Sequence, residues 1–208
     1  IASCLVGSEM CIRDSYKIAR QTAKEMRAMN MHWTFNPNVE VARDARWGRV
    51  GETYGEDPYL VTLLGVQSVK GYQGDLNGNE DVLACIKHFV GGSEPINGTN
   101  GSPTDLSERT LREVFFPPFE AGVKAGAMSL MTAHNELNGI PCHSNEWLMQ
   151  DILRGEWNFP GFVVSDWMDI EHIHDLHATA ENLKEAFYQS IMGGMDTVSY
   201  THLRAHET

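Results

Sequence analysis

The sequence lacks the features that mark several common classes of protein. It contains only four cysteines among 208 residues, which is too few to argue a disulfide framework. No apolar stretch reaches the roughly 18 residues that a membrane span requires. Acidic residues outnumber basic ones by 28 to 16, and the formal net charge is −12. An acidic chain without a basic stripe argues against a nucleic-acid partner. We therefore expect neither nucleic acid nor membrane as a partner.

A glycine-rich GxGxxG turn after an apolar strand is also missing, which disfavours a dinucleotide-binding doubly wound sheet. Helical and strand patterns instead alternate along the chain. Strand-like segments lie at 31–37, 82–90, 128–133, 162–164 and near 195, and helical segments at 16–29, 57–71, 105–125, 144–152 and 180–192. We expect Asp57, Asp105 and Ser144 to cap three of these helices. The alternation predicts a parallel sheet covered by helices.

Polar side chains follow four of the strand-like segments at their C-terminal ends. They are Asn36-Pro37-Asn38, Lys87-His88, His134-Asn135 and Ser165-Asp166. In (β/α)8 barrels this rim of strand ends builds the active site. The expected fold class is therefore α/β, a partial (β/α)8 TIM-type barrel.

The two ends of the chain are related in an unusual way. Cys4–Asp14 and Val198–Thr208 can be encoded by opposite strands of one DNA segment, which resembles a sequencing adapter translated as protein. We expect residues 1–15 and 198–208 to be adapter-derived and exclude them from reasoning about the fold. Residues 16–197 are the expected barrel domain, truncated at both ends, because a whole barrel typically needs ~250 residues.

Five motifs occur in a fixed order: RDARWGR, GETYGEDP, IKHFV, HNELNG and GFVVSDW. In this order they resemble the barrel domain of glycoside hydrolase family 3, over about residues 16–197. The resemblance implies a retaining, exo-acting β-glycosidase, above all a β-glucosidase. Such an enzyme hydrolyses terminal non-reducing β-linked sugars of an oligosaccharide or β-glucoside through a covalent glycosyl-aspartate, without a cofactor.

The resemblance also implies roles for individual residues. Asp166 in SDW is similar to the family's nucleophile, and Trp167 beside it is expected to flank the sugar. Arg49 in WGR, with Lys87 and His88 in KHF, resembles the set that holds the sugar hydroxyls. These residue types suit the chemistry, because cations keep a carboxylate ionised and an indole offers a flat apolar face to sugar C–H groups.

Four further residues are less clearly assigned. His134 stands where the family often has tyrosine, and a histidine can still hydrogen-bond the nucleophile. Met131, on the same strand, either lines the substrate pocket or belongs to the core. Arg43 and Arg46 are expected to be structural.

The stretch EHIHDLH, Glu171–His177, invites a different interpretation as a metal site. Its spacing matches neither the helical HExxH pattern nor a zinc finger. We expect a polar loop at the rim and no metal. A metal-dependent barrel hydrolase, a β-xylosidase of the same family and a noncatalytic carbohydrate-binding barrel remain alternatives.

No acid/base carboxylate can be assigned in this sequence. In many members of the family a C-terminal α/β-sandwich domain supplies it, so that domain of a full-length chain is an expected partner. The 208-residue chain alone is expected to be neither properly folded nor active, because an incomplete barrel leaves sheet edges open. A periplasmic or secreted location is plausible from the resemblance.

Overall fold

The computed structural model describes residues 2–200, with side chains described from residue 11 onward. A three-stranded parallel sheet lies at its centre, in the order β1 (Cys85–Phe89), β2 (Ser129–Thr132) and β5 (Phe162–Val164). These strands are almost entirely buried, as is usual for parallel strands covered on both faces. The α/β class and the parallel sheet expected from the sequence are confirmed.

Further segments extend this sheet at both edges through single parallel bridges. Trp33 pairs with a residue just before β1, and Asn38 pairs with a residue within β1. At the other edge, Thr197 pairs with Val164, the last residue of β5. The strands therefore follow one another in sequence order and in one direction. This part of the sheet does not contain the reversal of strand order that defines a doubly wound sheet.

The register of the strands places alternate side chains in rows on opposite faces. One row faces the helices and belongs to the main core: Ile86, Leu130 and Val163. The other row forms a separate buried cluster, against which Trp33 packs: Cys85, Met131 and Val164. Both faces of the sheet are thus covered within the described part of the chain.

The helices that precede β2 cover the face of the main core. α1 (Ala2–Ala28) packs along α2 (Pro58–Gln73), and α2 packs against α4 (Phe116–Lys124). α4 completes a continuous helical stretch that begins with α3 (Glu108–Thr110) and passes through the π-helical segment η2 (Leu111–Phe115). No described helix combines the length and the apolar character needed to cross a bilayer.

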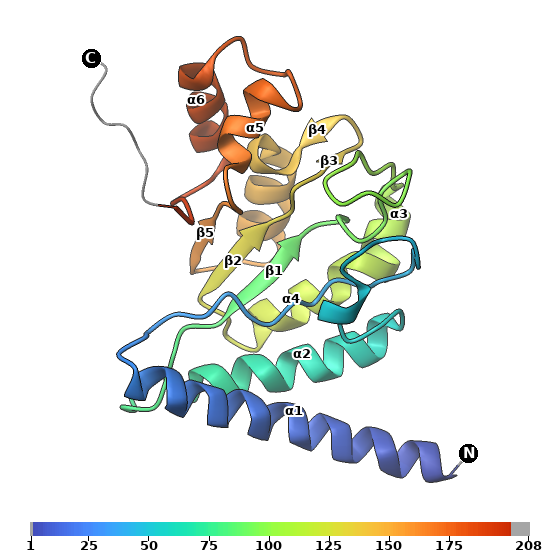
Figure 1. Ribbon diagram of the computed structural model, residues 1–208, viewed down its shortest axis with the longest axis vertical. Coiled ribbons are helices and arrows are strands. Elements are labelled where there is room, and N and C mark those ends of the chain that lie inside the picture. The colour runs from blue at the N-terminus through green and yellow to red at the C-terminus, as the bar shows by residue number, and fades with distance from the viewer. Residues whose placement is uncertain (1, 201–208) are drawn as a thin grey trace.

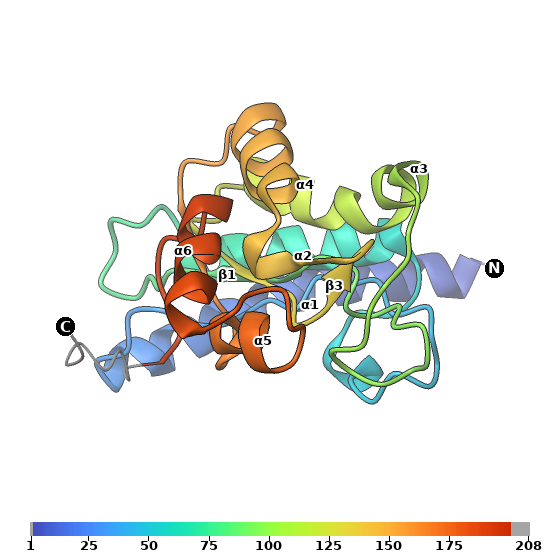
Figure 2. The same ribbon diagram turned by 90° about the horizontal axis from the view of Figure 1, so that it is seen from above.

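The remaining elements follow the ends of β2 and β5. They are the hairpin of β3 (Glu136–Leu137) and β4 (Ile140–Pro141), the 3-10 turn η3 (Cys142–Ser144), the π-helical segment η4 (Trp147–Glu156), α5 (Asp169–Asp175) and α6 (Leu183–Gly193). The arrowheads of β1 and β2 point toward α5 and the hairpin (Figure 1). Seen from above, α5 lies near the viewer, over the strand ends, while α1 and α2 run beneath them (Figure 2).

The caps show how far local sequence signals decide where helices begin. Asp57 caps α2 as expected, with its carboxylate accepting from two backbone amides at 2.8 and 3.0 Å. The other two expected caps are wrong. Ser107, rather than Asp105, caps α3, and Asn145, rather than Ser144, accepts an amide in the first turn of η4. Ser144 is used elsewhere, because its hydroxyl donates to a carbonyl within the preceding 3-10 turn.

The segments expected to be adapter-derived are only partly described. Residues 2–15 form the first half of α1, which continues without a break into the helix expected from Tyr16. Tyr200 belongs to the second segment and is 7% exposed, whereas 201–208 lie outside the described residues. The adapter origin of both segments stays a prediction.

Gln73, the last residue of α2, links this helix to the sheet through hydrogen bonds. Its side chain is buried, and its Oε1 accepts from the backbone amides of Ala84 at 3.2 Å and Met128 at 3.1 Å. Its Nε2 donates to the carbonyl of Gly126 at 2.7 Å. One amide side chain thereby satisfies three backbone groups just before β1 and β2.

We predict that Gln73→Met, which keeps the volume but not the hydrogen bonds, destabilises the fold by roughly 2–4 kcal/mol, because each buried polar group left unpaired costs about 1–3 kcal/mol. Urea unfolding of a form of the protein that melts cooperatively measures this difference. Gln67→Met is the control, since Gln67 lies half-buried on the same helix and makes no side-chain hydrogen bond among the described residues. Equal losses in the two variants would contradict the assigned role of Gln73.

Candidate active site

Asp166 lies directly beyond the C-terminal end of β5. The strand stays paired up to Ser165, whose amide donates to the carbonyl of Thr197 at 3.0 Å, and Asp166 follows at the edge. Its Oδ1 accepts from the amide of Trp167 at 2.7 Å. The side chain is 16% exposed, so its second oxygen, Oδ2, remains within reach of a bound molecule. The end of a buried strand thus carries a carboxylate into a partly open site.

Two histidines flank this second oxygen. His134, just after β2, places Nε2 2.9 Å from Oδ2 of Asp166, and His88, in β1, places Nε2 3.3 Å from the same atom. The two rings are stacked, with centroids 5.9 Å apart. The ends of three neighbouring parallel strands therefore meet at one carboxylate oxygen.

A second carboxylate stands behind each of these histidines. Glu40 is 2% exposed and lies with Oε2 2.7 Å from Nδ1 of His88. Asp169, at the start of α5, is 1% exposed and lies with Oδ2 2.7 Å from Nδ1 of His134. Acidic and basic groups alternate from Glu40 through Asp166 to Asp169, so each buried charge has an opposite neighbour.

A third histidine, His143, differs because it acts as an acceptor. Its Nε2 receives the backbone amide of Asp166 at 3.2 Å, which requires a lone pair on that nitrogen. Complete burial lowers the pKa of His143 to about 4. At neutral pH it is therefore an uncharged ring that holds the backbone of Asp166.

The contacts around Asp166 also set its charge and that of His134. Burial alone would lower the pKa of His134, but its contacts with Asp166 and Asp169 raise it to about 10. Burial would raise the pKa of Asp166, and the nearby His134, His88 and the Trp167 amide hold it well below its usual range instead. An ionised carboxylate beside a protonated histidine is the state that this geometry stabilises at neutral pH.

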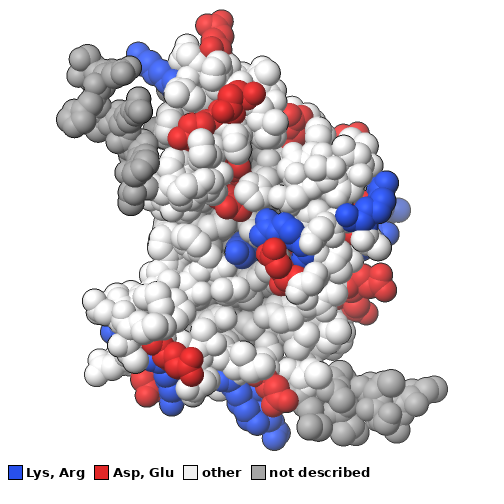
Figure 3. All heavy atoms as spheres, viewed as in Figure 1, with Lys and Arg blue, Asp and Glu red and all other residues white. Residues whose placement is uncertain are grey.

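Three of the expected sugar-binding residues, Arg49, Lys87 and Trp167, adjoin the residues of this cluster in space or in sequence. Arg49, which precedes the 3-10 turn η1 (Val50–Glu52), holds Glu52 through two hydrogen bonds and lies with Nη2 3.2 Å from Nε2 of His88. Among the described residues no hydrogen bond or ion pair engages the ammonium of Lys87. Trp167 is 62% exposed. Figure 3 shows acidic and basic side chains gathered in the middle of this face, between largely uncharged areas.

Two other residues singled out in the sequence have different surroundings. Met131 is 2% exposed in the cluster with Cys85 and Val164, which places it among packed side chains of the sheet. Arg46 pairs with Asp44, two residues before it, on the surface.

The stretch 171–177 lies largely in α5, so the expected loop is wrong. Asp169 and Glu171 in the first turn favour a helix start at this point. The three histidines of this stretch have three different partners and do not converge: His172 contacts Asp169, His174 the carbonyl of Ala180, and His177 Glu136. The one group in the described chain whose ligand-type atoms all lie within 4.8 Å of one another is His134, Asp166 and Asp169. In this group His134 has Nε2 next to Asp166 and Nδ1 next to Asp169, so the three residues form two ion pairs.

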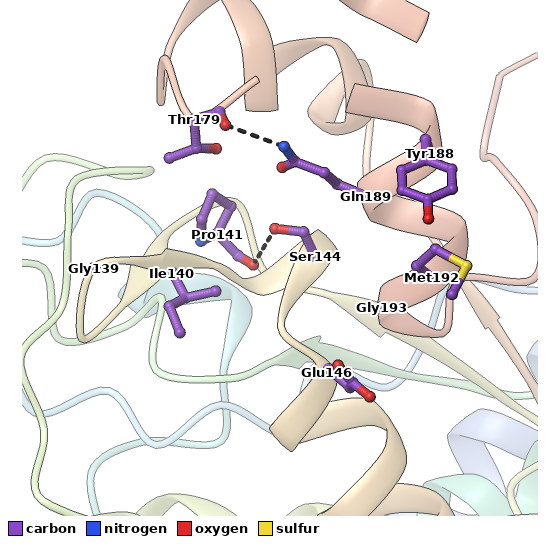
Figure 4. Close-up of a pocket in the computed structure, with 10 residues that line it drawn as sticks. All are labelled: Gly139, Ile140, Pro141, Ser144, Glu146, Thr179, Tyr188, Gln189, Met192 and Gly193. Atoms are coloured by element: carbon purple, nitrogen blue, oxygen red, sulfur yellow. Dashed lines mark hydrogen bonds between the residues drawn. The ribbon is translucent and has the colours of Figure 1, made fainter. Parts of the chain in front are cut away.

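A separate pocket of about 430 Å³ opens between the β3–β4 hairpin and α6 (Figure 4). Its polar side chains are largely used within the protein: Gln189 donates to the carbonyl of Thr179 at 3.1 Å, and Ser144 to that of Pro141 at 3.3 Å. None of the residues around Asp166 lines it. The cluster around Asp166 is therefore the stronger candidate for an active site.

Sequence reasoning missed three residues of this cluster: Glu40, His143 and Asp169. Glu40 lies two residues beyond Asn38, where a strand-like alternation could have placed it on the same side. Asp169 lies three residues after Asp166, one helical turn away. Nothing near His143 in the sequence indicates its contact, which depends on the fold.

Comparison with known proteins identifies the family. The sequence model described as "Glycosyl hydrolase family 3 N terminal domain" matches residues 4–202. The chain belongs to this family. A β-xylosidase of Formosa agariphila is 50% identical over 185 residues, which are 86% of this chain and 26% of that protein. A periplasmic β-glucosidase of Salmonella typhimurium is 36% identical over 180 residues, or 86% of this chain and 23% of that protein.

Solved structures of family 3 enzymes also resemble the fold. The crystal structure of β-glucosidase from Listeria innocua superposes with a TM-score of 0.87 at 39% identity, over 92% of this chain and 27% of that one. The chain thus spans about a quarter of the length of the relatives that it matches.

We predict that His134 stays protonated through neutral pH and titrates near its pKa of about 10. Because this value lies above the ordinary ~6.5 of an unfolded chain, the pairing stabilises the fold fully below ~6.5 and loses its effect as the pH rises toward 10. Histidine-selective isotope labelling and NMR follow the ring, with the signal identified through its loss in His134→Gln. His143 is the internal control and should stay neutral down to about pH 4. A His134 signal that titrates near neutrality would contradict the assignment.

Proposed function

We propose that this chain is the catalytic part of a retaining, exo-acting β-glycosidase, foremost a β-glucosidase. The observation that carries this proposal is Asp166: an ionised carboxylate at a strand end, flanked by two histidines and followed by an exposed tryptophan. A double displacement needs such a carboxylate as its nucleophile. Membership of a glycoside hydrolase family supports the same conclusion.

In the proposed first step, Oδ2 of Asp166 attacks the anomeric carbon as the bond to the leaving oxygen breaks. The leaving oxygen takes a proton from a general acid, and a covalent glycosyl-aspartate remains. Water then attacks the same carbon and gives up a proton to the same group, now a base. The bond to Asp166 breaks, which restores the carboxylate and releases the sugar.

Arg49, Lys87, His88 and Trp167 are the proposed sugar contacts. Arg49 supplies N–H donors beside His88, Lys87 precedes His88 in β1, and the exposed face of Trp167 suits the C–H groups of a sugar ring. His134 contacts the nucleophile, and we assign it to charge control. Met131 lies among packed side chains, so a sugar contact would need an open path to it that the described packing lacks.

We also propose that the sheet is part of a (β/α)8 barrel. Its strands follow one another in sequence order, all parallel, and they carry their polar residues at the carboxyl ends. Both features are typical of that fold. The chain covers only a quarter of its relatives' length, so we place the general acid in a C-terminal domain of a longer protein. One relative is named as periplasmic, which supports a periplasmic or secreted location.

A β-xylosidase is the second candidate, because the relative from Formosa agariphila at 50% identity carries that name. Hydrolysis rates on aryl β-glucosides and aryl β-xylosides, measured on the full-length enzyme, separate the two. A fluorinated glycoside that traps the covalent intermediate separates both from a noncatalytic carbohydrate-binding barrel. Binding without adduct formation at Asp166 would refute the enzyme assignment.

We predict that Asp166→Asn in the full-length enzyme lowers kcat on the order of a thousandfold or more while the fold survives, since an amide side chain cannot act as the nucleophile. Aryl glucoside hydrolysis measures the loss, and circular dichroism checks the fold. Asp151→Asn is the control, because Asp151 is exposed and makes no side-chain contact in the described structure. A variant at Asp166 that keeps more than a few per cent of the activity would remove the basis of the proposal.

We predict that the sugar released first keeps the β-anomeric configuration, because two successive inversions restore it. Proton NMR in the first minutes of hydrolysis, before mutarotation, distinguishes the anomers. An α-anomer as the first product would rule out attack by Asp166 on carbon, regardless of how the variants behave.

A further inference from the structure

Asp169 is a buried carboxylate for which the reaction above has no use. It begins α5, three residues after Asp166, and its side chain is 1% exposed. Its Oδ2 lies 2.7 Å from Nδ1 of His134, and its Oδ1 lies 3.0 Å from Nδ1 of His172. A carboxylate this deep in a protein is costly unless cations or donors surround it.

The ring between Asp169 and Asp166 has a different nitrogen close to each carboxylate, Nδ1 at 2.7 Å and Nε2 at 2.9 Å. A neutral imidazole carries only one N–H, so one of its nitrogens would direct a lone pair at a carboxylate oxygen. Beside two ionised carboxylates, the imidazolium form of His134 brings positive charge to both contacts and no lone pair to either. The two short distances therefore favour a proton on each nitrogen.

We propose that Asp169 is a positioning residue, which holds His134 in the orientation and the doubly protonated state that direct an N–H at the nucleophilic oxygen of Asp166. This inference rests on the proposed role of Asp166 as nucleophile. Asp169 itself touches no substrate and acts only through the ring. The aspartate makes a histidine serve as a fixed cation beside the reacting oxygen.

This cation serves both steps of the reaction. Before attack it keeps Asp166 ionised, and during release of the sugar it stabilises the carboxylate as the leaving group. The raised pKa of His134 and the lowered pKa of Asp169 agree with this pairing. Loss of the Asp169 charge should allow His134 to lose its proton at a lower pH.

The other titratable groups near His134 do not replace Asp169. The ring of His88 stacks on it from β1, but its own carboxylate partner is Glu40. His143 lies 3.5 Å from the same Oδ2 of Asp169 and is an uncharged ring, and His172 lies 3.0 Å from Oδ1 of Asp169; neither is an anion that could take the place of Asp169. Within the described residues, the ionised groups closest to the ring are thus the two carboxylates of Asp166 and Asp169, and the ring of His88 stacks on it.

The test compares kcat/KM against pH for the full-length enzyme and Asp169→Asn. The substrate is a dinitrophenyl β-glycoside, whose leaving group departs without protonation. The pKa of the general acid therefore does not determine the loss of kcat/KM at alkaline pH. We expect Asp169→Asn to remain within about threefold of wild type near pH 6 and to fall by about tenfold or more near pH 9, with the alkaline limb shifted down by at least about one unit. His172→Gln, which removes the ring that contacts Oδ1 of Asp169, should keep the wild-type profile.

Any other outcome of this pH comparison would contradict the inference. A wild-type profile in Asp169→Asn, or an equal loss at every pH, would mean that Asp169 does not control the protonation of His134. In the background His134→Gln, adding Asp169→Asn should change kcat/KM less than about twofold, because the ring through which it acts is gone. If Asp169→Asn does not fold, Asp169→Glu, with its carboxylate displaced by one methylene, should show a smaller shift in the same direction.

Trapping with a fluorinated glycoside separates this inference from the proposed function. An adduct at Asp166 in the wild type together with an unshifted profile in Asp169→Asn refutes only the positioning role. Absence of any adduct at Asp166 refutes both.

Discussion

The contact between the Asp166 carboxylate and the two histidine rings is the interaction on which the rest of this site depends. An anion at the end of a buried strand is unfavourable unless positive charge or N–H donors lie close to it. His88 and His134 provide them, and each ring in turn has a buried carboxylate on its far side. Changing one member would therefore alter the charge state of its neighbours as well as remove a contact.

The parallel sheet makes this arrangement possible with a small number of elements. β1, β2 and β5 lie side by side and end at the same edge, so His88 and His134, far from Asp166 in the sequence, come to 3.3 and 2.9 Å from its carboxylate. The rows of apolar side chains on both faces hold the strands in place beneath the edge. A shift of one residue in any strand would turn its polar group away from the others.

The sequence alone was enough to predict the residues that stand on strand ends. Asp166, His88 and His134 each follow an apolar run, and the common edge of a parallel sheet brings such residues together. The sequence was not enough to predict Glu40 and Asp169, the carboxylates that contact the histidine nitrogens facing away from Asp166. Their roles depend on which nitrogen of which ring faces them, and no local pattern encodes that. The two wrong caps, Asp105 and Ser144, have a related cause, because a neighbouring side chain with equal propensity lay in the better position.

The presence of histidine at position 134, where the family often has tyrosine, imposes a requirement that a tyrosine would not. A phenol is neutral and donates its O–H to a carboxylate without any further partner. A histidine can serve as a fixed cation there only if a second anion keeps it protonated, and Asp169 is the anion in contact with its other nitrogen. His134 and Asp169 are thus a pair in which the first is useful only with the second. A change from histidine to tyrosine at this position would leave Asp169 buried with one partner fewer, so the two positions are coupled by the cost of burying a charge.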